Sequence, residues 1–216
     1  SPRVFPRMVY DASRGLTLLY GGNDKTNKWP HDLWEWDGES WHEADSNPEG
    51  SSLSSHFVVY DRLREAIMIN DYNTMTHRWS GGNWSVSTSV DGKLVSAADI
   101  MIHESAREIT TLFEHNNATC DQEIHEWNGS SWTSSNAPGP SIRASAMVYD
   151  TVRGVASLFG GRCYPPTWLQ ETWEWDGETW FEVDTQGGPI PPSRGRHAMA
   201  YDALREVSVL FGGRND

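Results

Sequence analysis

The sequence predicts an all-β chain made of repeated antiparallel units, the architecture of a β-propeller. Three observations predict it: a pair of Trp residues that recurs along the chain, a Gly-containing turn inside each pair, and a strand–turn–strand segment before each pair. A fixed period of about 20 to 50 residues is the sequence signature of a repeat architecture. The first Trp residues of successive pairs are separated by 43, 48 and 48 residues, and the pairs are Trp36/Trp41, Trp79/Trp84, Trp127/Trp132 and Trp175/Trp180.

Each strand–turn–strand segment alternates apolar and polar residues, which predicts two strands with one packed face. The segments cover residues 7–22, 56–71, 99–115, 145–161 and 197–213, and we number them copies one to five. In every copy an acid is followed three residues later by Arg. The acid can accept backbone N–H groups in the turn and pair with the Arg, so we assign these residues to turn stabilisation. The pairs are Asp11/Arg14, Asp61/Arg64, Glu104/Arg107, Asp150/Arg153 and Asp202/Arg205.

The recurring Trp pair predicts two further strands in each copy. Copy four shows the pattern in Trp173-Glu174-Trp175, which precedes an Asp-Gly turn, a strong hairpin signal between apolar strands. Each copy is therefore expected to be a four-stranded antiparallel sheet with strands a, b, c and d in chain order. Such sheets bury both faces by stacking around an axis, as in a propeller. We expect one propeller domain over residues 1–216, or part of one, with repeats 1–48, 49–92, 93–139, 140–190 and 191–216.

The units resemble kelch repeats of the bacterial style with a Trp-Glu-Trp-Asp-Gly core. The resemblance covers essentially the whole chain. In that family strand b ends in Gly-Gly, strand c carries an aromatic residue and strand d carries a Trp. Copies two and three depart from the pattern, with Asn70-Asp71 and Glu114-His115 in place of the diglycine. The matching diglycines are Gly21-Gly22, Gly160-Gly161 and Gly212-Gly213.

The fifth repeat contains only strands a and b. We expect that the chain is part of a longer protein or that a partner chain completes it, since an open strand edge favours association. We therefore also consider that the chain associates with further copies of itself.

The composition excludes some partners and favours one location. A net charge of −13 argues against binding to nucleic acid phosphates and to anionic membrane surfaces. Because no stretch approaches the roughly 18 apolar residues of a spanning helix, we predict no membrane insertion. Few Lys and many Ser, Thr, Asn and Trp favour an extracellular or cell-surface location, with the cytoplasm left open. Cys120 and Cys163 fall in b–c loops of neighbouring copies, where a disulfide and two free thiols are both compatible with the sequence.

The candidate ligand-binding residues lie in the b–c and d–a loops, which emerge on the same rim of a four-stranded blade. In kelch propellers that rim is the usual binding face, so the resemblance implies a protein, peptide or glycan ligand there. Exposed aromatic rings beside guanidinium donors suit a sugar ring or a peptide carboxylate. The alternative for the two Trp residues is that each covers the side of its blade. The candidates are Trp29, Trp168, Arg7, Arg143, Arg194 and Arg196.

A metal site is a weaker hypothesis. Asp121 and His125 match part of an iron-ligand pattern of kelch nitrile-specifier proteins, and His115 lies nearby, but the expected Glu is Asn117. His125 also occupies a core-facing position, which favours a structural role. We therefore predict a binding or scaffold module with no catalysis, metal or cofactor. Two alternatives stay open: a metal- or sugar-acting propeller enzyme, of galactose-oxidase or nitrile-specifier type, and a structural module completed by a partner chain.

Overall fold

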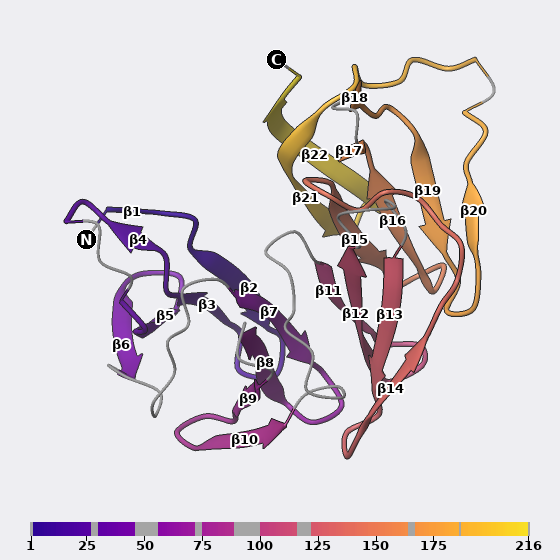
Figure 1. Ribbon diagram of the computed structural model, residues 1–216. Helices are drawn as coiled ribbons and strands as arrows, with labels where there is room; N and C mark the ends of the chain where they lie inside the picture. Colours follow the sequence, from indigo (N-terminus) through magenta and orange to yellow (C-terminus); the bar gives the residue numbers. More distant parts are fainter. Residues whose placement is uncertain are drawn as a thin grey trace. The chain divides into compact units, whose positions relative to one another are not determined.

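The computed structural model describes residues 2–26, 30–45, 56–71, 75–88, 100–115, 122–163, 167–185 and 187–215. It forms two compact units, Ser1–Ala97 and Ala98–Asp216, which we call unit 1 and unit 2 and describe separately. All the regular secondary structure of the described residues is β-strand (Figure 1). Among the described residues there is no helix that is long and apolar enough to cross a membrane.

Unit 1 contains copies one and two as two four-stranded antiparallel sheets. The first has the order β2-β3-β5-β6, from β2 (Arg7–Asp11), β3 (Leu16–Tyr20), β5 (Leu33–Trp36) and β6 (Trp41–Asp45). The second has the order β10-β9-β8-β7, from β7 (His56–Asp61), β8 (Ala66–Asp71), β9 (Met75–Trp79) and β10 (Trp84–Thr88). A short pair, β1 (Arg3–Val4) with β4 (Asn23–Asp24), extends copy one.

Unit 2 contains copies three to five. Copy three is the sheet β11-β12-β13-β14, from β11 (Ile100–Glu104), β12 (Ile109–His115), β13 (Gln122–Trp127) and β14 (Trp132–Ser135). Copy four is the sheet β15-β16-β19-β20, from β15 (Ala146–Asp150), β16 (Val155–Phe159), β19 (Thr172–Trp175) and β20 (Trp180–Glu182). Copy five is the hairpin of β21 (Gly195–Asp202) and β22 (Val207–Arg214), and a short pair joins β17 (Arg162–Cys163) to β18 (Thr167–Trp168).

The predicted order of strands a to d is confirmed in copies one to four. The Trp pair lies directly opposite across each c–d hairpin, with ring centroids 5.4 Å apart for Trp36/Trp41 and 5.5 Å apart for Trp175/Trp180. The diglycine alignment of copy two was wrong by one residue. Asn70 faces Phe57 in the ladder as Tyr20 faces Arg7, so Asn70 corresponds to Tyr20 and not to the first glycine.

The acid and Arg of each a–b turn stabilise it as predicted. In copy four, Asp150 accepts bonds from the Arg153 backbone N–H at 3.0 Å and from the Arg153 guanidinium at 2.7 Å. The same guanidinium reaches Glu174 of strand c at 2.6 Å, and Arg14 and Arg107 make the matching bridges in copies one and three. In copies one, three and four the Arg therefore joins the a–b turn to strand c.

Neighbouring copies pack face to face within each unit. In unit 1, Leu18 and Tyr20 of copy one share a buried cluster with Ile67, Ile69 and Trp79 of copy two.

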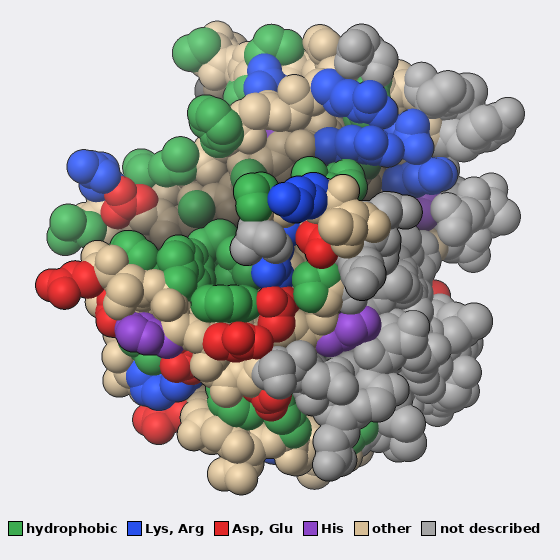
Figure 2. Space-filling model, turned by 90° about the vertical axis from the view of Figure 1, so that its left-hand side faces the viewer, with side chains coloured by type: hydrophobic (Ala, Val, Ile, Leu, Met, Phe, Trp, Pro, Cys, Tyr) green, Lys and Arg blue, Asp and Glu red, His purple; other side chains and the backbone are tan. Residues whose placement is uncertain are grey.

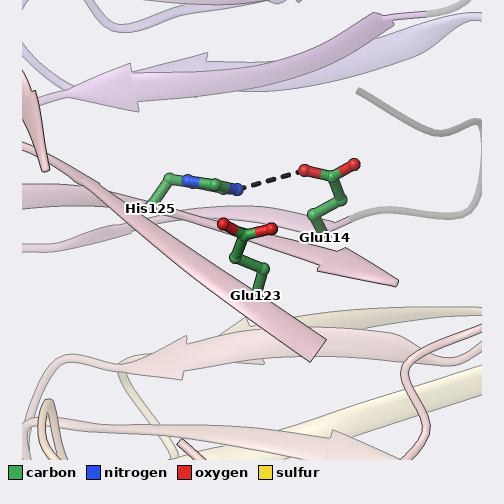
Figure 3. A group of neighbouring side chains, drawn as sticks. All are labelled: Glu114, Glu123 and His125. Carbon is green, nitrogen blue, oxygen red and sulfur yellow. Dashed lines mark hydrogen bonds and ion pairs between the residues drawn. The ribbon is translucent and has the colours of Figure 1, made fainter. Parts of the chain in front are cut away.

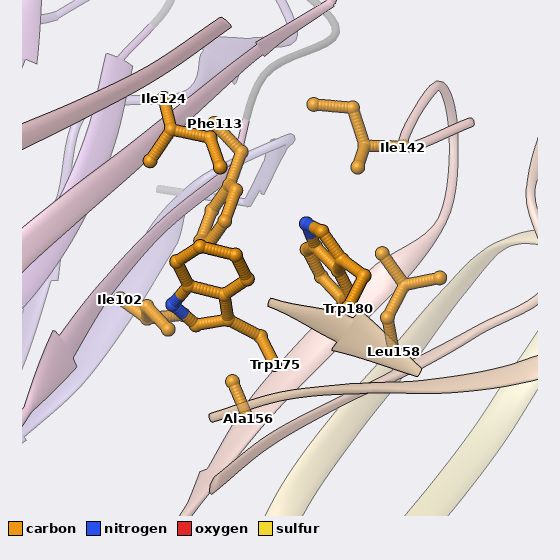
Figure 4. Packing of buried hydrophobic residues seen from close by; sticks show 8 residues of the cluster. All are labelled: Ile102, Phe113, Ile124, Ile142, Ala156, Leu158, Trp175 and Trp180. Atoms are coloured by element: carbon orange, nitrogen blue, oxygen red, sulfur yellow. The ribbon is translucent and has the colours of Figure 1, made fainter. Parts of the chain in front are cut away.

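In unit 2, Phe113 of copy three contacts two Trp rings of copy four (Figure 4). Its ring centroid lies 5.7 Å from that of Trp175 and 5.3 Å from that of Trp180. One face of a sheet thus covers the opposite face of the next.

In copies two and four, a Tyr in strand a contacts the a–b turn of the copy before it. The Tyr60 hydroxyl accepts the Ser13 backbone N–H at 3.3 Å, and the Tyr149 hydroxyl accepts the Ala106 N–H at 3.3 Å. In copy five, Asp150 of copy four raises the pKa of Tyr201 to about 12. Tyr residues at this position of strand a therefore lie beside the preceding turn in copies two, four and five.

The last hairpin exposes the face that other copies bury. Phe211 corresponds to Phe113 and Phe159, yet it is 81% exposed while they are 0% and 4% exposed. Val207 and Val209 on the same face of β22 are also exposed. In unit 2, this sheet face has no following copy to cover it.

Candidate functional site

Five Arg residues gather in unit 2 where the b–c loop of copy four meets the d–a loops before copies four and five and the end of β22. We call this group the arginine rim: Arg143, Arg162, Arg194, Arg196 and Arg214. Arg162 follows the diglycine of copy four directly, and Arg214 follows that of copy five. Figure 2 shows basic side chains gathered at the upper right of the face that it draws.

Backbone hydrogen bonds tie the three segments of the rim together. The Arg162 N–H donates to the Arg143 carbonyl at 2.9 Å, and the Arg196 N–H donates to the Ala144 carbonyl at 2.7 Å. The Gly161 N–H donates to the Arg194 carbonyl at 2.8 Å. These bonds cross between loops, so they fix the backbone from which the guanidinium groups project.

The diglycine of copy four is required for this close approach. Gly160 and Gly161 have φ of 62° and 98°, which favours glycine. A Cβ on Gly161 would lie 2.9 Å from the Arg143 carbonyl oxygen. A Cβ on Gly160 would overlap the Arg194 carbonyl oxygen. The rim therefore depends on two residues without side chains.

Trp168 of β18 holds Arg162 in place. The Arg162 guanidinium lies over the Trp168 ring, 5.7 Å from its centroid, and the Ser141 hydroxyl donates to the Arg162 carbonyl at 2.7 Å. Gly195 packs against the six-membered ring of the Trp168 indole, so closely that a Cβ on Gly195 would overlap it. A cation over an aromatic face is a favourable contact. Trp168 thus acts on Arg162 in addition to the ligand contact predicted for it.

The rim carries positive charge that no described carboxylate neutralises. Among residues 2–215 as far as they are described, no ion pair links a rim Arg to an Asp or Glu, whereas six other Arg residues form such pairs. Desolvation together with the charges of Arg143, Arg196 and Arg214 lowers the pKa of Arg162. Desolvation is the larger cause of the shift, and the like charges of the three neighbouring Arg residues add to it.

Two buried His residues near the rim are neutral. Burial and the charge of Arg143 lower the pKa of His115, and burial and the charge of Arg194 lower the pKa of His197. No described atom lies in good hydrogen-bonding geometry with either ring nitrogen of His197. The net charge of the rim therefore comes from its Arg residues alone.

Arg194 has a structural role within the rim. Its guanidinium donates to the Gly212 carbonyl at 2.9 Å and to the Pro192 carbonyl at 3.0 Å. Arg3 makes the equivalent bond to the Gly21 carbonyl at 2.9 Å in copy one. The repetition of this bond indicates that Arg194 supports the diglycine turn of its own copy.

The structure brings four of the six predicted ligand-binding residues together: Trp168, Arg143, Arg194 and Arg196. Arg7 lies in unit 1, where its guanidinium is 5.6 Å from the centre of the Phe57 ring, and Trp29 lies outside the described residues. Sequence reasoning missed Arg162 and Arg214. The signal was present, because each follows a diglycine by one position.

Of the three predicted metal residues, only His125 lies in a group of possible metal ligands. Glu114, Glu123 and His125 form a cluster whose ligand atoms all lie within 4.8 Å of one another (Figure 3). His125 Nε2 lies 3.1 Å from Glu114, and His125 Nδ1 lies 3.0 Å from the Ser134 hydroxyl. These three side chains have the donor types for a divalent cation. His115 is not in the group, and Asp121 lies outside the described residues.

Unit 1 contains a separate pocket of about 260 Å³ lined by Arg3, Leu19, Trp34 and Trp41. Asp32 accepts bonds at 2.6 Å from both the Arg3 guanidinium and the Trp34 indole N–H. The charge of Arg3 is therefore balanced inside the protein, unlike that of the rim.

Cys163 is disulfide-bonded, and it is adjacent to Arg162 in β17. Cys120, the other cysteine of the sequence, lies outside the described residues. A covalent bond thus braces the strand that carries Arg162.

Comparisons with known proteins show the fold. No family model and no curated protein matches the chain. Among solved structures, YjhT aligns over 99% of this chain and 78% of its own, with a TM-score of 0.70 and 10% identity. Aleuria aurantia lectin, a six-bladed β-propeller, aligns as a mutant bound to Fucα1-6GlcNAc over 82% of this chain and 57% of its own, with a TM-score of 0.52 and 14% identity.

The chain has the β-propeller fold. SapL1 lectin in complex with α-methyl fucoside also aligns, over 90% of this chain and 68% of its own, with a TM-score of 0.56 and 13% identity. At these identities the likeness concerns the fold alone, so the site must be argued from its own residues.

Proposed function

We propose that the chain is a non-catalytic binding module, of the kelch type, that recognises a glycan on the arginine rim. The observation that carries the proposal is the gathering of guanidinium donors on a backbone fixed by cross-loop hydrogen bonds. Rigid placement of donors reduces the ordering cost of binding. The rim is the face formed by b–c and d–a loops, where the sequence predicts ligand binding.

The chemistry of a sugar suits this surface. Sugar hydroxyl oxygens accept hydrogen bonds, and each guanidinium presents several N–H donors in one plane. SapL1 and Aleuria aurantia lectin, which share the fold, were solved with fucose-containing ligands. This favours a glycan over the protein and peptide ligands also considered, and an extracellular or cell-surface location fits a glycan ligand.

Glycan binding with rim and control variants tests the proposal. We would screen the protein on a glycan array, then measure the affinity of each hit for the wild type, Arg143→Gln and Arg62→Gln by calorimetry. Arg62 is an exposed Arg of unit 1, so its variant removes the same charge away from the rim. We expect Arg143→Gln to weaken binding at least about tenfold, equal to about 1.4 kcal/mol, and Arg62→Gln to leave it unchanged. An array without hits, or equal affinities of all three proteins, would contradict the proposal.

A second candidate function is assembly, favoured by the exposed face of β22. Phe211 projects from this face and is 81% exposed, although the equivalent residues of copies three and four are buried. Light scattering at increasing protein concentration tests it. Growth of the mass above 24.4 kDa, abolished by Phe211→Ser, would support assembly, and a constant monomer would exclude it.

A further inference from the structure

We infer that the recognised glycan carries an anionic group, a carboxylate or a sulfate, which binds among Arg143, Arg162, Arg196 and Arg214. The inference rests on the proposed function and adds the chemical class of the ligand. Arg194 is left out of the set because its guanidinium already bonds to two backbone carbonyls.

The first argument is charge. The sequence has 30 acidic and 17 basic residues, so carboxylates are abundant. Three other Arg residues each bond to two carboxylates, one in their own a–b turn and one on strand c: Arg14, Arg107 and Arg153. The four Arg residues of the inferred site have no ion-paired acid among the described residues.

The second argument is rigidity. Arg162 is held between Trp168 beneath its guanidinium and backbone bonds to the d–a loop. Arg196 and Ala144 both have φ near +60°, at 57° and 59°, and a hydrogen bond joins them. Phe5 holds the same conformation at the equivalent position of copy one, with φ of 56°, so this backbone shape belongs to the repeat. The Arg162 guanidinium and the backbone that carries Arg143 and Arg196 are therefore positioned before any ligand arrives.

The third argument is the fit between an anion and the cluster. Like charges that lie close together repel, and one anion among them turns the repulsion into attraction. The planar guanidinium matches two oxygens of a carboxylate or sulfate with two parallel hydrogen bonds. His115 and His197 add no charge, since burial first and the neighbouring Arg second lower the pKa of each.

The size of the basic surface favours a single anionic group over a polyanion such as nucleic acid. The net charge of −13 repels a long polyanion away from the rim. Nucleic acid binding requires an extended basic face, and four Arg residues at one rim do not provide it. An oligosaccharide with one acidic sugar places its charge in the cluster and its neutral sugars on the surrounding loops.

The test compares matched sugars. We would measure the affinities of a neutral disaccharide, its glucuronate analogue and its 6-sulfated analogue for the wild type and for the double variant Arg143→Gln/Arg196→Gln. Both side chains can be shortened without removing a backbone hydrogen bond of the rim, and the melting temperature checks folding. We expect at least one acidic sugar to bind the wild type about tenfold more tightly than the neutral parent. The double variant should lose that difference, and salt should weaken only the acidic ligand's binding.

The outcomes separate this inference from the proposed function. If neutral and acidic sugars bind equally and the double variant weakens both, the glycan function stands and the anionic class is wrong. If none of the three disaccharides binds, the thermal shift with inorganic sulfate, compared with chloride at equal ionic strength, decides. Stabilisation of the wild type by sulfate but not of the double variant would support the anion site and contradict the glycan function. No stabilisation would overturn both.

Discussion

Replacing Gly160 with Ala tests the link between the diglycine and the arginine rim. Gly160 has φ of 62°, and a Cβ there would overlap the Arg194 carbonyl oxygen, with the Leu169 carbonyl oxygen 3.2 Å away. Gly212 provides a matched control, because it occupies the same repeat position with φ of 74° and nothing within 4 Å of an added Cβ. Both variants place Ala in left-handed backbone, but only Gly160→Ala meets backbone atoms.

The structure gives the size of the difference. Left-handed backbone costs an Ala residue about 1 to 2 kcal/mol. Forcing an added methyl group into a packed site costs about 1 to 3 kcal/mol more. We therefore expect Gly212→Ala to lower the free energy of unfolding by about 1 kcal/mol, after the gain from a stiffer unfolded chain. Gly160→Ala should lower it by about 2 to 4 kcal/mol.

Urea denaturation followed by Trp fluorescence measures both values. Since Gly160 lies beside the Arg194 carbonyl, its variant should also weaken glycan binding, while the control should not. Equal losses of stability in the two variants would refute the reasoning, because the contact with the rim backbone would then contribute nothing.

Two further predictions concern the packing and the turns. Phe113→Ala should lower the free energy of unfolding of unit 2 by about 3 to 5 kcal/mol in urea, because Phe113 is fully buried against Trp175 and Trp180; a loss below about 1 kcal/mol would contradict this packing. Burial disfavours the Asp150 carboxylate, yet bonds from Tyr201, Arg153 and the turn backbone hold its pKa below the usual range. The folded pKa is thus lower than the unfolded one, so this stability is present above about pH 4 and is lost as the pH falls further. Urea midpoints between about pH 5 and pH 2 should fall less steeply for Asp150→Asn than for the wild type, and equal slopes would contradict the assignment.

The strands and turns could be predicted from the sequence because their signals are local. Alternation along strand a, the acid–Arg pair and the Trp pair across the c–d turn each lie within a few residues, and each recurs. The fold class followed from stacking such sheets. The alignment of Asn70 failed because copy two has no diglycine to mark the end of its strand b.

The candidate site could be predicted only in part, because it is formed by loops distant in sequence. Arg143, Arg162 and Arg196 are joined by hydrogen bonds between separate loops, and no periodicity reports those contacts. The placement of Trp168 under Arg162 depends on the short β17–β18 pair, which the alternation of the longer strands does not predict. The available sequence signal was an Arg directly after each of two diglycines. It gives the position of these Arg residues in the repeat, but it does not show whether an acidic residue pairs with them.

The Tyr contacts between successive turns make growth of the chain by whole units simple. Tyr149 binds the turn of copy three, and its own copy offers Asp150 to Tyr201 of copy five. A duplicated unit inserted there by recombination would, however, separate copy four from the loop of copy five that carries Arg194 and Arg196. The backbone bonds from Gly161 to the Arg194 carbonyl and from Arg196 to the Ala144 carbonyl would then be lost. The arginine rim therefore binds copies four and five into one functional unit, and added units would leave the ligand site intact only elsewhere in the chain.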